Sequence, residues 1–111
     1  MRRNPDYLFA RLNYAEFCLA RGEYEKIPEI FENKYDLQLL YPKRNRFHVS
    51  EVTNFIGIMG LYFSKTNQRE LAEKYNEILQ ELGRDLPIAK RLNRELNPGF
   101  FTRVLSRLLE K

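Results

Sequence analysis

The segment from Tyr14 to Phe31, with the sequence YAEFCLARGEYEKIPEIF, constrains the fold most strongly. On both sides of Gly22 its apolar residues recur at the three- and four-residue spacing of an amphipathic helix. Glycine takes the left-handed conformation that ends many helices at little steric cost, so Gly22 predicts a tight turn. The segment therefore indicates two helices that form a hairpin.

Apolar residues at helical spacing continue through the chain, interrupted by Gly, Pro and Asn. The first helix is expected to start at Asn4–Asp6 and to run from Tyr7 to Arg21, and the second to run from about Tyr24 toward Pro42. Further helices are expected over about residues 50–64, 67–83, 86–96 and 97–110. Because no segment alternates as a strand does, the sequence predicts an all-α fold with about five to six helices.

The inward faces of these helices follow from the same spacing. The residues expected to face the core are Ile27, Ile30, Phe31, Tyr35 and Leu39; Val52, Ile56, Met59, Gly60 and Phe63; Leu71, Ala72, Tyr75, Ile78, Leu79 and Leu82; and Ile88, Ala89, Leu92 and Leu96. Ser50 and Asn67 are the expected N-caps of the third and fourth helices. Glycine inside a helix costs about 1 kcal/mol relative to alanine, so Gly57 and Gly60 predict close approach by a neighbouring backbone.

Landmarks of the first hairpin recur 45 residues later. Ala15 aligns with Gly60, Gly22 with Asn67, and Pro42 with Pro87. Repetition of size, polarity and turn residues at a fixed period is typical of stacked helical hairpins.

The small residues Ala15 and Gly60, the Gly22–Tyr24 turn, Ala72 and the closing prolines resemble the tetratricopeptide repeat (TPR) family. The chain departs from that family at Ile27, where alanine is usual, and in its 45-residue spacing, against about 34 in the family. The resemblance implies stacked antiparallel hairpins in a TPR-like superhelix. Hairpin one would span about residues 5–41, hairpin two about 50–83 and C-terminal helices about 86–110, within one domain over 1–111.

The resemblance also implies a concave groove, lined by the first helix of each hairpin, that binds a peptide or a partner helix. The groove residues carried over by position are Phe9, Leu12, Asn13, Glu16, Leu19, Asn54, Leu61 and Lys65. The alternative for Phe9, Leu12 and Leu19 is packing against a neighbouring repeat. Because a repeat array needs about three repeats, we expect a segment of a longer protein or a homodimer, the alternative being a compact bundle capped by its last helix.

The formal net charge is +4, from 19 basic and 15 acidic residues. A basic ridge is expected from Lys43, Arg44, Arg46, Lys90, Arg91 and Arg94. Such a ridge suits RNA or another phosphate-bearing or acidic partner. Nucleic acid is the less favoured partner, because the aromatic platform of single-strand binders is missing from the sequence.

The inventory of reactive residues is small. His48 is the one histidine, and the lone Cys18 excludes an intramolecular disulfide and a cysteine-based zinc site. We therefore expect no enzyme activity, no cofactor and no metal. Apolar runs are shorter than the roughly 18 residues of a membrane span, so we expect no membrane association and a cytoplasmic location. The leading hypothesis is a non-catalytic protein–protein interaction scaffold, and the alternative is a basic helical domain that binds RNA.

Overall fold

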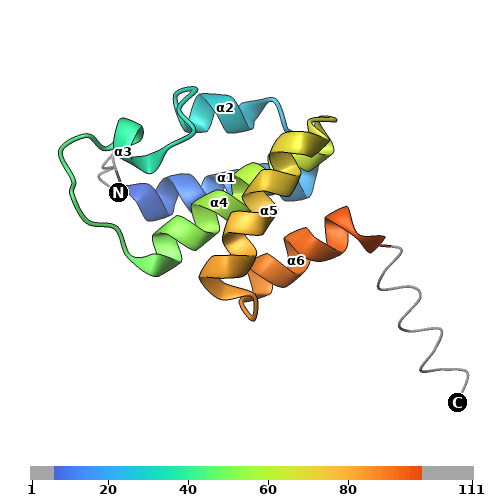
Figure 1. Ribbon diagram of the computed structural model, residues 1–111. Coiled ribbons are helices and arrows are strands. Elements are labelled where there is room, and N and C mark those ends of the chain that lie inside the picture. The colour runs from blue at the N-terminus through green and yellow to red at the C-terminus, as the bar shows by residue number, and fades with distance from the viewer. Residues whose placement is uncertain (1–6, 99–111) are drawn as a thin grey trace, which may run out of the picture.

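The computed structural model describes residues 7–98, which form six helices and no strand (Figure 1). The helices are α1 (Leu8–Arg21), α2 (Lys26–Ile30), α3 (Leu37–Leu40), α4 (Val49–Lys65), α5 (Arg69–Gly83) and α6 (Pro87–Leu96). The prediction of an all-α fold with about six helices is confirmed. The expected helix start at residues 4–6 and the expected last helix over 97–110 fall almost wholly outside the described residues.

Helix α4 is the central element of the fold. It packs against α1, α5 and α6, which cover it from different sides (Figure 1). Its buried positions therefore extend beyond the predicted face and include Phe55, Ile58 and Leu61, whereas Val52 and Ile56 are only half-buried. A helix enclosed by several neighbours buries more than one stripe, which the spacing of one amphipathic face does not show.

The two glycines of α4 receive side chains from α6. A Cβ atom built on Gly57 would lie 2.2 Å from Cγ1 of Ile88, and one on Gly60 would lie 2.5 Å from Cδ2 of Leu92. The expected close approach is therefore present, but side chains make it, not a neighbouring backbone. All four residues predicted for the inward face of α6 are buried: Ile88, Ala89, Leu92 and Leu96.

The turn after α1 forms as predicted. Gly22 has φ +76°, its amide donates to the carbonyl of Leu19 (3.1 Å), and the amide of Glu23 donates to the carbonyl of Cys18 (2.9 Å). This pair of hydrogen bonds satisfies carbonyls that the helix end leaves without partners.

The prediction of one continuous second helix is wrong. Helix α2 ends at Ile30, because Glu32 and Asn33 take left-handed φ values of +54° and +58°. The chain resumes helical structure only at α3, whose N-cap Asp36 accepts from the amide of Gln38 (2.8 Å). Of the predicted inward residues, Ile27 and Phe31 are buried, whereas Tyr35 and Leu39 are exposed.

Two predicted N-caps are also wrong. The N-cap of α4 is His48 and not Ser50, and the amide of His48 donates to Oε1 of Glu51 (2.9 Å). Asn67 takes the left-handed conformation, so α5 begins one residue later than expected, after Gln68.

Arg11 fastens the interrupted second segment to α1. Its Nε donates to the hydroxyl of Tyr41 (3.0 Å), its Nη2 to Oε2 of Glu32 (2.9 Å), and its Nη1 to the carbonyl of Ile30. Burial lowers the pKa of the Arg11 guanidinium. The interactions with Glu32 and Tyr41 outweigh this effect, so the pKa of Arg11 is raised. The guanidinium supplies donors where the helix stops, which keeps the carbonyl of Ile30 satisfied.

Candidate functional site

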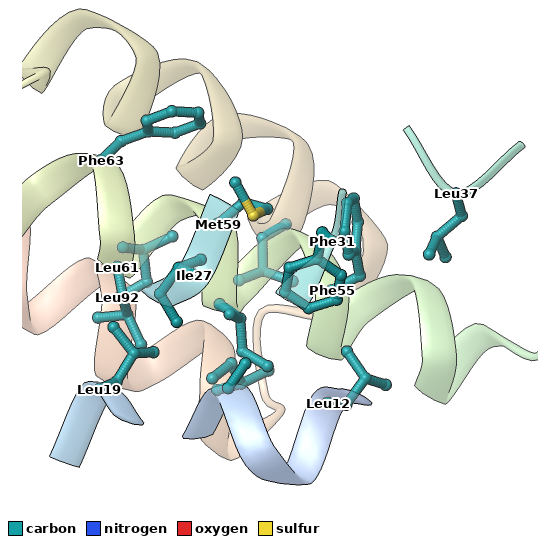
Figure 2. Close-up of a cluster of buried hydrophobic side chains, with 14 of the residues drawn as sticks. Leu12, Leu19, Ile27, Phe31, Leu37, Phe55, Met59, Leu61, Phe63 and Leu92 are labelled. Atoms are coloured by element: carbon teal, nitrogen blue, oxygen red, sulfur yellow. The ribbon is translucent and has the colours of Figure 1, made fainter. Parts of the chain in front are cut away.

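The predicted groove is not an open surface in this structure. Leu12, Leu19 and Leu61 are 4%, 8% and 3% exposed, and they belong to the hydrophobic core. Figure 2 shows Leu19, Leu61 and Leu92 converging from α1, α4 and α6. The assignment of the three leucines to an open groove lining is therefore wrong, because all three are buried in the core.

The remaining predicted groove residues are polar contacts or surface residues. Glu16 accepts two hydrogen bonds from Nη1 of Arg91 (2.9 and 2.7 Å), and Lys65 pairs with Glu95 (2.7 Å). The hydrogen bond from Lys65 to Glu95 raises the pKa of the lysine. Glu16 and Lys65, two of the predicted groove residues, therefore contact α6 where a partner was expected to bind. The others are Phe9 (half-buried), Asn13 (exposed) and Asn54, whose amide donates to the carbonyl of Ser50 (2.9 Å).

Arg44, assigned to the basic ridge, is a structural residue. It donates from Nη2 to Oε1 of Glu51 (2.8 Å) and from Nη1 to Oε2 (3.2 Å), and its guanidinium lies 4.4 Å from the ring centroid of Phe47. Glu51 is 5% exposed, so the pair offsets the cost of burying a carboxylate. The hydrogen bond from Arg44, followed by that from the amide of His48, lowers the pKa of Glu51.

The other basic residues are divided between two places. Lys43 and Arg46 are exposed on the connection between α3 and α4, while Lys90, Arg91 and Arg94 are exposed on α6. These two places lie apart in Figure 1. The structure therefore shows two small basic surfaces where one ridge was expected.

An apolar cleft of about 410 Å³ lies between the segment around α3, the first half of α4 and the middle of α5. The residues that line it are Tyr35, Asp36, Leu37, Gln38, Phe47, Val52, Phe55, Ile56, Tyr75 and Ile78. The sequence prediction missed this cleft. It expected one continuous helix where the chain breaks after Ile30, and so expected Val52 and Ile56 to be covered.

Helix α5 continues the cleft as an apolar stripe, made of Leu71, Tyr75, Ile78 and Leu82. Leu71 is 40% exposed, and Ile78 and Leu82 are each 47% exposed. The prediction that these three residues face the core is wrong. Ala72 and Leu79, predicted for the same face, are buried as expected. The apolar stripe lies on the neighbouring face of the helix.

Polar contacts fix α5 against α6 on its other side. The amide of Gln80 donates to the carbonyl of Ala89 (2.9 Å), and that of Asn76 donates to Oδ1 of Asn93 (3.3 Å). Counted around the helix, Asn76 and Gln80 lie on one side of the buried face and the apolar stripe lies on the other. This contact explains why α6 leaves the apolar stripe uncovered.

Tyr75 joins the cleft to the apolar stripe. Its hydroxyl donates to the carbonyl of Tyr35 (3.3 Å), and its ring packs against that of Phe63, with centroids 5.2 Å apart. Burial, followed by the nearby Asp36, raises the pKa of Tyr75. This hydrogen bond ties the irregular segment before α3 to α5.

Acidic residues border the apolar stripe on its solvent side. Glu70, Glu77 and Glu81 are exposed there, with Lys74 as a basic residue among them. Asp36 lies at the cleft itself. The site therefore combines an apolar floor with a mainly acidic border.

Comparisons of the chain with family models, with curated proteins and with solved structures found no match. Among residues 7–98, no helix has the length and apolar character needed to cross a membrane, and no group of three His, Cys, Asp or Glu residues is placed to hold a metal ion. The lone Cys18 is buried.

Proposed function

We propose that the chain is a non-catalytic protein–protein interaction scaffold that binds an amphipathic helix or peptide of a partner at the cleft and apolar stripe. The observation that supports this proposal is the continuous apolar surface from the cleft to Leu82. Contiguous exposed apolar surface is unusual on monomeric proteins and marks interaction sites. The TPR-like relationship and the cytoplasmic location remain part of the proposal.

The geometry of the apolar stripe favours a helical partner. Its residues are spaced by four, three and four positions, which is the spacing by which two helices pack side by side. The cleft of about 410 Å³ beside it has room for an apolar anchor residue of the partner. Recognition of this kind places the apolar face of an amphipathic helix in a groove.

Substitution of Ile78 tests this proposal. We expect Ile78→Glu to reduce capture of a specific partner about thirty-fold or more, since hot-spot losses reach about 2 kcal/mol and beyond. Asn13→Glu is the matched control, because it adds the same charge at an exposed site of the original groove prediction. Quantitative affinity capture, with circular dichroism to verify folding, makes the comparison. Retention of the partner by Ile78→Glu and its loss by Asn13→Glu would show that the cleft assignment is wrong.

The second candidate function is binding of RNA or another phosphate-bearing partner by the basic surface of α6. Exposed Lys90 and Arg94 are the observation that favours it. For single-stranded nucleic acid, the logarithm of the association constant should fall linearly with the logarithm of the salt concentration. The slope should be about −0.7 for each phosphate contact. A salt titration of the parent chain and of Lys90→Glu with Arg94→Glu decides the matter, and no measurable binding at low salt ends this hypothesis.

A further inference from the structure

The polar edge of the apolar stripe indicates the charge of its occupant. Counted around α5, Glu70, Glu77 and Glu81 follow one edge of the apolar stripe, on the side opposite the buried face of the helix. Lys74 is the basic residue among them, and it lies with Glu81 nearest to the apolar stripe. All four side chains are exposed. Three carboxylates and one ammonium group give this edge a net negative charge.

These three glutamates have no ion pair within residues 7–98, although Lys74 is one helical turn away from Glu70 and Glu77. The remaining glutamates of α4, α5 and α6 are all paired: Glu51 with Arg44 (2.8 Å), Glu73 with Arg69 (2.8 Å) and Glu95 with Lys65 (2.7 Å). The unpaired carboxylates of these helices are therefore the ones that follow the apolar stripe, where they are accessible to a basic group of another molecule.

The cleft adds a further acidic residue on the side of α3. Asp36 lines the cleft, and its side chain accepts from the amide of Gln38. At the end near Phe47, the guanidinium of Arg44 is already bonded to both carboxylate oxygens of Glu51, and Arg46 is the exposed basic residue. The charges are thus unequal around the site, and its acidic side is the one formed by α5.

A second copy of this chain is a poor occupant when it offers its own α5. In a two-fold dimer Glu70, Glu77 and Glu81 would face the same glutamates, and like charges across an interface disfavour binding. The phosphates of a nucleic acid would be repelled for the same reason. The occupant that offsets these charges is basic.

We propose that the partner segment bound at the cleft and apolar stripe is a basic amphipathic helix. Its apolar face covers Leu71, Ile78 and Leu82, and lysine or arginine residues beside that face pair with Glu77 and Glu81. This inference rests on the proposed function and specifies the chemistry of its partner. Complementary charge beside an apolar contact selects the partner and sets its orientation.

Two synthetic amphipathic peptides of about 18 residues, long enough to form a helix, test the inference. They share the same leucines at the spacing of the apolar stripe, and their polar positions are lysine in one and glutamate in the other. The chain carries a formal net charge of +4, so its overall charge favours the acidic peptide. We nevertheless expect the basic peptide to bind at least about five-fold more tightly, because the edge of α5 is acidic. Fluorescence anisotropy of the labelled peptides measures both affinities.

Charge reversal on α5 should change this preference. We expect Glu77→Lys with Glu81→Lys to weaken binding of the basic peptide about ten-fold and to strengthen binding of the acidic one, with both effects largely lost at about 1 M salt. Glu25→Lys with Glu29→Lys is the matched control, because it changes the net charge equally at two exposed glutamates of the α2 region that do not line the cleft. Circular dichroism verifies that each variant folds.

Three results would overturn the inference. One is equal binding of the two peptides by the parent chain, and another is an equal response of the two double variants. The third is a dimeric mass by light scattering that Ile78→Gln converts to a monomeric mass, because it would assign the apolar stripe to a second copy.

Ile78→Gln also separates this inference from the proposed function, because it removes apolar surface without adding charge. If Ile78→Gln weakens both peptides alike and the parent chain prefers neither, the proposed function stands and only this inference fails. If the basic peptide is preferred but its binding is insensitive to Ile78→Gln, it binds by charge alone, and both proposals fail. Absence of binding by either peptide contradicts both as well.

Discussion

The two halves of the molecule are held together by different kinds of contact. In residues 49–96, three helices pack by shape, with Ile88 and Leu92 seated over the two glycines of α4. In residues 8–48, α1 is followed by two short helices, α2 and α3, which are separated by irregular backbone whose carbonyls need donors. Side chains supply those donors: Arg11 to Ile30, Gln38 to Arg44 (2.8 Å) and Arg44 to Arg46 (3.0 Å). Regular helices satisfy their own backbone, whereas interrupted ones depend on specific polar side chains.

The largest effect should come from the residue that joins the two halves. Phe31 is fully buried and packs edge-to-face on Phe55 of α4, with centroids 5.1 Å apart. We expect Phe31→Ala to lower the free energy of unfolding by about 3–5 kcal/mol. Urea denaturation followed by circular dichroism measures it, with Phe31→Leu as a milder control. A loss below about 1 kcal/mol would mean that the two halves are not coupled through this ring.

A second prediction concerns the polar contacts of the first half. We expect Glu51→Gln to cost about 1.5–3 kcal/mol at neutral pH, because the hydrogen bond from Arg44 is to a charged group. The folded pKa of Glu51 is lowered, so this contribution is complete above the ordinary carboxylate pKa of about 4.3. It is lost as the pH falls through the lower, folded value.

Urea denaturation of both proteins over a pH series tests this sign. The stability difference between the parent and Glu51→Gln should shrink on acidification. Glu73→Gln is the control, since Glu73 pairs with Arg69 (2.8 Å) on the exposed surface of α5. A difference that stays constant down to acid pH would show that the ionised carboxylate of Glu51 is not what stabilises the connection.

The glycine contacts of the second half give the third prediction. Gly57→Ala would force Ile88 aside, at about 1–3 kcal/mol for overpacking, partly offset by about 1 kcal/mol of helix propensity. In a double-mutant cycle, Ile88→Ala should remove most of that penalty. Gly22→Ala is the control, because it is strained by its positive φ and meets no atom within 4 Å. Equal penalties for Gly57→Ala with and without Ile88 would contradict packing by shape.

The halves also differ in how well the sequence predicts them. Periodicity was sufficient for α6, where Ile88, Leu92 and Leu96 are buried as expected, and for the position of the close approach at Gly57. The break after Ile30 was not predictable, because left-handed Glu32 is held by Arg11, which is distant in sequence.

The candidate site was missed for a related reason. Leu71, Ile78 and Leu82 have the spacing of core residues, and only the placement of α6 against Asn76 and Gln80 decides that they remain exposed. Helical spacing identifies an apolar face but not the neighbour that covers it. Membership of the TPR family stays a prediction. The binding surface that the resemblance assigned to α1 and α4 is wrong for the three buried leucines.

The smallest effect should come from the ion pair between α1 and α6. Glu16 and Arg91 have side chains 42% and 43% exposed, so water and salt screen their attraction. We expect Glu16→Gln to cost less than about 1 kcal/mol, and less still in high salt, as measured by urea denaturation. Arg91→Gln in the same cycle isolates the pair. If α6 is held chiefly by Ile88 and Leu92, the pair contributes orientation and little stability. A loss of unfolding free energy above about 2 kcal/mol would mean that polar contacts stabilise both halves, and would contradict the distinction between them.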